Sequence, residues 1–372
     1  MMTNKNCAKV YIRPIKHCNF SCKHCFCSAS KIEKQTLALS DAHKFLLLLS
    51  KEYNNIKVIF HGGEPTLAGE QFYNSIFEYE KALETEYKVS FSNIIQTNGY
   101  LLDDEFIDIL KSGNCLISLS FDGPHNSDLR PYTSKVYEVI QLLKKKKARF
   151  GVISVETQKS ISDLFQTYSW FKREEINFKI LPIQARGLAK QSEYELILSD
   201  YSKNLKEVYE YWLTDKTCKI QVMTFQEFLK ICKNKNFRQN WNKKNRFALN
   251  SDGNLYIYGY PNEEEFSLGN IHTCNKISDT YNNHNYLAFQ KIIETDRKNR
   301  CPSCVYNDVC GGFALYDAYL YDSSKESIDY CCNLTRQTLH DVLEINKQIK
   351  KDFENQEFSQ YNDYVIHHFW QE

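Results

Sequence analysis

The sequence Cys18-Asn19-Phe20-Ser21-Cys22-Lys23-His24-Cys25 places three cysteines at the spacing C-x3-C-x2-C. It follows a short apolar run, residues 10–15, which favours a strand leading into a loop. Three thiolates can hold three irons of a [4Fe–4S] cube and leave the fourth iron open to a small chelating molecule. A zinc knuckle is the alternative, although zinc sites usually combine two C-x2-C pairs or pairs of Cys and His.

The composition of the 372-residue chain limits the classes of protein that it resembles. A formal net charge of +1 gives no reason to expect nucleic acid or a membrane surface as a partner. No apolar run is long enough for a membrane span, and the N-terminal residues show no signal peptide. Fourteen cysteines in a long chain without an export signal are more typical of metal ligands than of disulfides. We therefore expect a cytoplasmic protein.

Strand-like and helix-like patterns alternate from residue 9 to about residue 215. The expected strands are 9–15, 58–60, 91–96, 116–121, 150–155 and 178–183. The expected helices are 40–53, 69–87, 103–112, 137–147, 161–172 and one within 194–212. Such alternation predicts an α/β fold with a parallel sheet, and six units suit a partial, open (β/α)6 barrel of the TIM-like kind.

Polar or glycine-rich segments follow the carboxyl ends of four of these strands. They are residues 18–25, 61–66, 97–99 and 122–124. Each alone is typical of a turn, because turns require Gly, Pro, Asn and Asp. In barrel enzymes, however, the carboxyl ends of the strands carry the chemistry. The four segments together therefore predict one active-site mouth.

The cysteine triplet and Gly62-Gly63-Glu64-Pro65 resemble motifs of the radical S-adenosylmethionine (SAM) enzymes. The resemblance implies that Cys18, Cys22 and Cys25 hold a [4Fe–4S] cluster whose open iron binds SAM. An electron from that cluster then splits SAM to give a 5′-deoxyadenosyl radical. The SAM-contacting residues that the resemblance implies are Gly62, Gly63, Glu64, Pro65, Asn98, Ser120, Asp122 and Arg130. For Arg130, a contact with substrate and an exposed loop position are the alternatives.

A second cysteine group lies near the C-terminus, at Cys301, Cys304, Cys310 and the pair Cys331-Cys332. The spacing C-x2-C-x5-C is typical of metal sites, and four thiolates suit zinc as well as iron–sulfur. Behind a radical SAM barrel, this group resembles the SPASM domain of peptide-modifying radical SAM enzymes. The Asp-Gly step of residues 251–254 predicts a hairpin turn that matches the same domain.

The likeness to SPASM domains is incomplete. A full SPASM domain has seven cysteine ligands and two auxiliary clusters, whereas the hairpin here continues through Tyr258 and Gly259, and Ala314 replaces an expected cysteine. The missing positions all belong to the first auxiliary cluster. We therefore expect two [4Fe–4S] clusters, one that binds SAM and one auxiliary. The expected auxiliary ligands are Cys301, Cys304, Cys310 and Cys332, the last preferred over Cys331 by its spacing.

These resemblances predict three segments of chain. Residues 1–215 form the radical SAM partial barrel, 216–245 form a polar bridge, and 246–372 form a small SPASM-like domain with a C-terminal helix and tail. Residues 225–232 could instead belong to the closing helix of the barrel. We expect no separate domain before the first strand, so a leader peptide would bind a separate protein or the bridge.

The resemblance implies an enzyme that takes a hydrogen atom from a ribosomally synthesised peptide. The first expectation is maturation of that peptide by a side-chain crosslink, through a C–C, C–O or C–S bond. Anaerobic sulfatase maturation to formylglycine is an alternative, against which Gly259 counts, because a catalytic Asp stands there in that group. Peptide epimerisation and a non-enzymatic iron–sulfur scaffold are further alternatives. The expected partners are a precursor peptide and an electron donor such as flavodoxin or ferredoxin.

Overall fold

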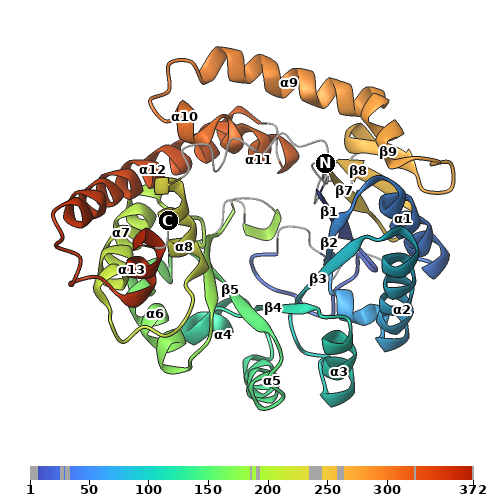
Figure 1. Cartoon of the computed structure of the whole chain (residues 1–372), viewed down its shortest axis with the longest axis horizontal. Coiled ribbons are helices and arrows are strands. Elements are labelled where there is room, and N and C mark those ends of the chain that lie inside the picture. The colour runs from blue at the N-terminus through green and yellow to red at the C-terminus, as the bar shows by residue number, and fades with distance from the viewer. Residues whose placement is uncertain are drawn as a thin grey trace. The chain divides into compact units, whose positions relative to one another are not determined.

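The structure is a computed structural model that describes residues 7–25, 29, 34–184, 187–189, 193–233, 245–257, 264–321 and 324–370. Its contacts divide the chain into two compact units that are interleaved along the sequence (Figure 1). The first unit comprises residues 1–120, 129–151 and 243–294, and the second comprises 121–128, 152–242 and 295–372. The domain boundaries expected at residues 215 and 245 stay a prediction.

A sheet with the strand order β4-β3-β2-β1-β7-β8-β9 forms the framework of the first unit. Its strands are β1 (Cys7–Ile12), β2 (Asn55–Phe60), β3 (Ser90–Thr97), β4 (Leu116–Ser120), β7 (Arg246–Leu249), β8 (Asn254–Ile257) and β9 (Ser267–Asn270). The strands from β4 to β7 pair in parallel, and β8 and β9 are antiparallel to their neighbours. Residues such as Val10 and Val58 face each other and are fully buried, which anchors the register.

The first unit has four longer helices: α1 (Leu39–Glu52), α2 (Glu70–Tyr87), α3 (Asp104–Ser112) and α5 (Thr133–Lys145). Helices α1, α2 and α3 each connect two successive parallel strands of its sheet. Helix α1 packs on α2, and α1, α2 and α3 follow one side of the strands in Figure 1. The sequence sets their ends locally. Asp103 caps α3 by accepting a hydrogen bond from the Phe106 amide at 2.9 Å, and Gly113 follows its last residue.

The predicted hairpin at residues 251–254 is present between β7 and β8. Gly253 has φ +76°, and its amide donates to the Asn250 carbonyl at 2.9 Å. A left-handed residue at that place explains the Asp-Gly step. Because β7 pairs in parallel with β1, residues 246–249 extend the sheet that carries the N-terminal strand.

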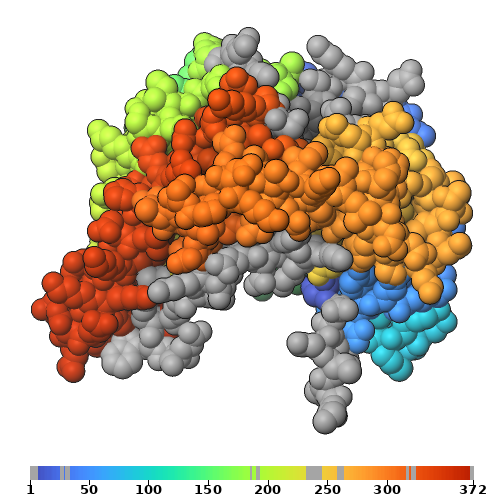
Figure 2. All heavy atoms as spheres, turned by 90° about the horizontal axis from the view of Figure 1, so that it is seen from above, coloured from blue at the N-terminus to red at the C-terminus, as the bar shows by residue number. Residues whose placement is uncertain are grey.

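A 3-10 helix, η8 (Ile277–Asn282), fastens the end of this hairpin region to α1. The Glu52 carboxylate accepts from the Ile277 amide at 2.6 Å and the Ser278 amide at 3.0 Å. The hydroxyls of Tyr53 and Tyr281 are 2.7 Å apart. In Figure 2 the gold residues of this region accordingly lie against blue residues of the N-terminal part.

The second unit contains the parallel pair β5 (Phe150–Glu156) and β6 (Phe178–Pro182). Its helices are α4 (Asn126–Leu129, at the unit border), α6 (Leu164–Arg173), α7 (Leu198–Thr214), α8 (Met223–Lys233), α10 (Asn307–Cys310), α11 (Phe313–Tyr321), α12 (Lys325–Glu354) and α13 (Asp363–Trp370). Helix α9 (His284–Arg300) contributes to both units. Helix α12 packs along α7 and α8, where Asn346 accepts from the Tyr209 hydroxyl at 2.8 Å and donates to the Phe228 carbonyl at 2.9 Å.

The predicted alternation of six strands with helices is confirmed, and the parallel sheet is that of an α/β protein. Residues 223–233 form helix α8, which packs on β6. The bridge expected over residues 216–245 stays a prediction. None of the described helices is long and apolar enough to cross a membrane.

Candidate cofactor and cluster sites

The cysteine triplet lies in a loop just beyond the end of β1. The Cys25 amide donates to the Cys22 carbonyl at 3.2 Å, and the Phe20 amide donates to the Cys18 sulfur at 3.3 Å. Burial, opposed by the hydrogen bond from the Phe20 amide, raises the pKa of Cys18 to about 12, with added contributions from the charges of Glu64, Cys22 and Cys25. A metal cluster would overcome this penalty, because binding displaces the thiol protons.

The Gly62-Gly63 pair sits directly after β2 and packs against the backbone that leads into the cysteine loop. The Gly63 amide donates to the Ile15 carbonyl at 3.1 Å. A Cβ at Gly63 would lie 2.0 Å from the His17 carbonyl oxygen, and one at Gly62 would lie 2.4 Å from the Ile15 carbonyl oxygen. Side chains are therefore excluded at both positions, because the two segments approach too closely for a Cβ.

Glu64 is buried and joins the ends of β2 and β3. One carboxylate oxygen accepts from the Thr66 amide at 3.0 Å and from the hydroxyls of Thr66 and Thr97, both at 2.6 Å. The other accepts from the Asn98 amide at 2.7 Å. Burial raises the pKa of Glu64, and these hydrogen bonds oppose the rise. The carboxylate thus connects β2 to β3 within the protein, and its expected contact with SAM stays a prediction. Pro65, the last residue of that motif, begins a buried 3-10 turn.

Asn98 connects the end of β3 to the cysteine loop. Its side-chain nitrogen donates to the Asn19 side-chain oxygen at 2.9 Å and lies 3.9 Å from the Cys18 sulfur. Its side-chain oxygen accepts from the Tyr100 amide at 3.0 Å. An amide N–H beside a ligating sulfur orients the ligand and tunes the metal site. Asn98 therefore has contacts that suit a residue supporting the first cluster.

Ser120 ends β4 and belongs to a polar row with residues on the neighbouring strand. Its hydroxyl accepts from the Gln96 side-chain nitrogen at 2.9 Å, and the Ser118 hydroxyl donates to the Gln96 side-chain oxygen at 2.7 Å. Arg130 is partly exposed and follows Leu129, whose carbonyl accepts from the Lys23 amide at 3.0 Å. The chain around Arg130 therefore touches the cysteine loop directly.

Asp122 is buried in the second unit. Its side chain accepts from the Val155 amide at 2.8 Å, and its amide donates to the Asn126 side-chain oxygen at 3.0 Å. Asp122 and Val155 thus fix the loop after β4 to β5 within this unit.

Glu156, at the end of β5, is a buried acid that spacing alone did not single out. Its carboxylate accepts from the hydroxyls of Ser154 at 2.9 Å and Ser160 at 2.7 Å. Burial raises its pKa to about 7, these two bonds oppose the rise, and the charge of Asp122 adds to it. The pattern Ser-x-Glu-x3-Ser at a strand end is the sequence signal that could have found it.

The second cysteine group closes around one pocket in the second unit. Cys301, Cys304, Cys310 and Cys332 all line it. Burial raises the pKa of Cys332 to about 11, and the charges of Cys310 and Cys301 contribute. Cys331 is absent from the described lining of that pocket. The choice of Cys332 as the fourth ligand is consistent with this placement and stays a prediction.

The positions that depart from a full SPASM pattern differ in what the structure describes. Ala314 lines the pocket of the second cysteine group and has no metal-binding atom. Tyr258 and Gly259 lie outside the described residues. The donor sets that remain, three thiols in one loop and four around one pocket, match the ligand numbers of an open and a closed [4Fe–4S] cube.

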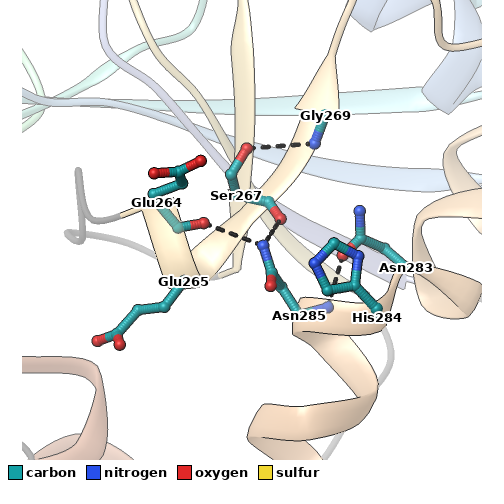
Figure 3. A pocket seen from close by; sticks show the side chains of 7 residues that line it. All are labelled: Glu264, Glu265, Ser267, Gly269, Asn283, His284 and Asn285. Carbon is teal, nitrogen blue, oxygen red and sulfur yellow. Dashed lines mark hydrogen bonds between the residues drawn. The ribbon is translucent and has the colours of Figure 1, made fainter.

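A wide hollow of about 730 Å³ lies elsewhere in the first unit, beside β9 (Figure 3). It is lined by Glu264, Glu265, Ser267, Gly269, Asn283, His284 and Asn285. The Asn285 side-chain nitrogen donates to the backbone carbonyls of Glu264 and Ser267, both at 2.9 Å. These two carbonyls are therefore already hydrogen-bonded within the protein. Its described lining contains none of the predicted site residues.

Comparison with known proteins identifies the N-terminal part of the chain. Residues 12–164 match the model of the radical SAM superfamily. A cysteine-type anaerobic sulfatase-maturating enzyme of Clostridium perfringens is 25% identical over 340 residues, which cover 85% of this chain and 90% of that protein. A serine-type anaerobic sulfatase-maturating enzyme of Bacteroides thetaiotaomicron is 21% identical over 398 residues, which cover 94% and 92%.

Solved structures show the same fold. The structure described as "Native anSMEcpe with bound AdoMet" has a TM-score of 0.76 at 21% identity and covers 93% of this chain and 100% of that one. Streptococcus suis SuiB bound to S-adenosylmethionine has a TM-score of 0.63 at 16% identity and covers 83% and 74%. The partial barrel expected from the sequence is therefore confirmed as the fold of this chain.

Proposed function

We propose that this chain, whose residues 12–164 match the radical SAM superfamily, is a radical SAM enzyme that oxidises a side chain of a peptide substrate. The observation that carries the proposal is the joint placement of the cysteine loop and Gly62-Gly63 at the strand ends of a radical SAM domain. Solved relatives of the same fold include "Native anSMEcpe with bound AdoMet and Cp18Cys peptide" and SuiB bound to its precursor peptide SuiA. Peptide is therefore the substrate class we assign.

Bound SAM supplies a 5′-deoxyadenosyl radical, which takes a hydrogen atom from the substrate. We assign Cys18, Cys22 and Cys25 to the three irons of the cluster that holds it. Asn98 holds the loop between those cysteines through Asn19. The remaining contacts with SAM are assigned to Gly62, Gly63, Glu64, Pro65, Asn98, Ser120, Asp122 and Arg130.

We assign the second cysteine group to one auxiliary [4Fe–4S] cluster, held by Cys301, Cys304, Cys310 and Cys332. Such a cluster supplies an electron acceptor. Two cubes require about eight iron and eight sulfide per chain. Iron and sulfide analysis after anaerobic reconstitution tests this number. About four or about twelve iron would contradict it.

Our first candidate reaction is a crosslink between two side chains of the peptide. It removes two hydrogens, one as an atom and one as a proton with an electron left for an acceptor. Two features of the chain favour it over sulfatase maturation. Gly259 replaces the Asp expected there in sulfatase-maturating enzymes, and Ala314 removes a ligand of the first auxiliary cluster.

Formylglycine formation is the second candidate, and the sulfatase-maturating relatives favour it. The two reported above match 85% and 94% of this chain and 90% and 92% of their own length. Oxidation of cysteine to formylglycine removes two hydrogens and also exchanges the sulfur for an oxygen from water, whereas a crosslink removes two hydrogens and keeps every sulfur. The mass of the product therefore separates the two candidates. Epimerisation leaves the mass unchanged and would introduce deuterium from D2O.

The test is an anaerobic incubation of reconstituted enzyme with SAM and dithionite. Two kinds of peptide are compared, a cysteine-containing sulfatase-type peptide and the product of a small open reading frame next to the gene. We expect 5′-deoxyadenosine in every case and a product that has lost two hydrogens from the neighbouring peptide. Sulfur–oxygen exchange in the sulfatase-type peptide would establish the second candidate instead. Absence of 5′-deoxyadenosine would contradict the enzymatic proposal altogether.

Two partners complete the proposal. The cluster that holds SAM must be reduced, for which we propose a flavodoxin or a ferredoxin. A separate leader-binding protein would explain how a precursor peptide is recruited. Replacing dithionite by flavodoxin and its reductase tests the first, and pull-down with a leader peptide tests the second.

A further inference from the structure

Basic side chains share the pocket of the second cysteine group. Arg300 and Arg336 line it together with the four thiols. Its described lining includes neither aspartate nor glutamate. The pocket therefore contains two kinds of group. Its thiols become negatively charged thiolates when they bind a metal, and its arginines are positively charged throughout.

The two lining arginines come from different helices. Arg300 ends α9 and is held by carboxylates, 3.2 Å from Asp296 and 2.7 Å from Asp329. Arg336 stands on α12 four residues after Cys332, which places both side chains on one face of the helix. Within the described part of the chain, Arg336 forms no salt bridge. No carboxylate of the described residues therefore pairs with its charge.

A third arginine, Arg297, lies beside the same group. It lies on α9, four residues before Cys301. Its side chain packs on Gly312, another residue that lines the pocket. A Cβ at Gly312 would lie 2.8 Å from three atoms of the Arg297 side chain. Burial and the neighbouring Cys310 raise the pKa of the Cys301 thiol, and Arg297 and Arg336 oppose that rise. The arginines are thus close enough to act on the sulfur electrostatically.

We propose that Arg297 and Arg336 raise the reduction potential of the cluster held by the four thiols and so make it an electron acceptor. This inference rests on the auxiliary cluster proposed above. Reduction adds one negative charge to a site that already carries four thiolates. Nearby positive charge stabilises the reduced form more than the oxidised form, because the attraction grows with the charge of the cluster. Solvent ions screen the exposed Arg336 more than a buried charge.

The test uses the full chain with Cys18→Ala, Cys22→Ala and Cys25→Ala, so that the auxiliary cluster is the one expected to remain. Anaerobic redox titration followed by electron paramagnetic resonance measures its midpoint potential. We expect Arg336→Gln to lower the ratio of reduced to oxidised cluster about threefold at fixed potential. We expect Arg297→Gln with Arg336→Gln to lower it about tenfold, which is ~59 mV for one electron.

Two variants serve as matched controls. Arg336→Lys keeps the charge and should keep the potential. Arg173→Gln removes a charge on α6, at a position outside the described lining of the pocket, and should change nothing. High salt should narrow the difference between Arg336→Gln and the parent, since the effect is electrostatic.

The outcomes separate the inference from the proposed function. A parent chain that binds no iron overturns the auxiliary cluster itself. A parent with about four iron, and a double variant of the same potential, overturns only the role of the arginines. Arg297→Gln and Arg336→Gln are also titrated as single variants. If one of them loses its iron, the midpoint potential of the other still tests the role of the arginines. Loss of iron in both would show that the arginines hold the site together, which contradicts the proposal.

Discussion

Glu156 should make the stability of this protein depend on pH in a way that one substitution removes. The side chain is 1% exposed and accepts hydrogen bonds from the hydroxyls of Ser154 and Ser160. Burial raises its pKa from 4.5 to about 7. The folded protein therefore binds this proton more tightly than the unfolded chain does. The stabilisation is fully present below pH 4.5 and is lost as the pH rises through about 7.

The magnitude follows from the displacement of the pKa. One pKa unit corresponds to about 1.4 kcal/mol, so Glu156 accounts for a loss of about 3 kcal/mol between pH 4.5 and pH 8. Glu156→Gln keeps the shape of the side chain and cannot ionise. The serine hydroxyls can donate to the new amide oxygen and accept from its nitrogen. We expect the variant to match the parent at pH 5 and to be about 2–3 kcal/mol more stable at pH 8.

Urea unfolding followed by tryptophan fluorescence, under anaerobic conditions at pH 5 and pH 8, measures this difference. Glu138→Gln is the matched control, since the Glu138 side chain is 69% exposed on α5, and it should change stability by less than about 0.5 kcal/mol at either pH. A difference between Glu156→Gln and the parent that is the same at both pH values would refute the reasoning. It would mean that Glu156 does not change its protonation in the folded protein over this range.

Three further substitutions, two of them paired with a control variant, test the two cysteine groups. Gly63→Ala should displace the cysteine loop and lower the iron content from about eight to about four per chain. Gly69→Ala is its control: a Cβ there meets no atom within 4 Å, so this variant should keep its iron despite a φ of +82°. Asn98→Ala removes the donor near Cys18 and should shift the potential and spectrum of the SAM-binding cluster, while the iron content stays near eight if the thiols suffice. Cys332→Ser should remove about four iron per chain and Cys331→Ser none, and equal losses would contradict the assignment of Cys332.

Much of the fold was predictable because its signals are local. Apolar periodicity indicates strands and helices, and residues such as Asp103 and Gly113 mark helix ends within a few positions. The Asp252-Gly253 step indicates a left-handed turn residue, which the hairpin between β7 and β8 contains. The spacing of the first cysteine group likewise reports its chemistry, because ligands of one cluster often come from one loop.

Other features of the site depend on contacts between distant residues and were not predictable. That Glu64 braces β2 to β3, rather than pointing freely into the mouth, depends on the positions of Thr97 and the Asn98 amide. The spacing of residues in the sequence does not predict these hydrogen bonds, since a carboxylate at a strand end can face either protein donors or a ligand. The raised pKa of Glu156 also follows from burial, which is a property of the packed protein.

The sequence by itself determined the chemical character of this protein: the cysteine spacing, the glycine pair and the alternation of strands and helices. These are set by bond geometry and periodicity over short stretches of chain. Tertiary structure alone decided that β7 pairs with β1 across more than two hundred residues and that arginines from two helices gather around the pocket of the second cysteine group. Strand pairings and pocket linings of this kind depend on which surfaces pack together. Neighbouring residues of a helix point in different directions, and the packing of the helix determines which of them faces inward.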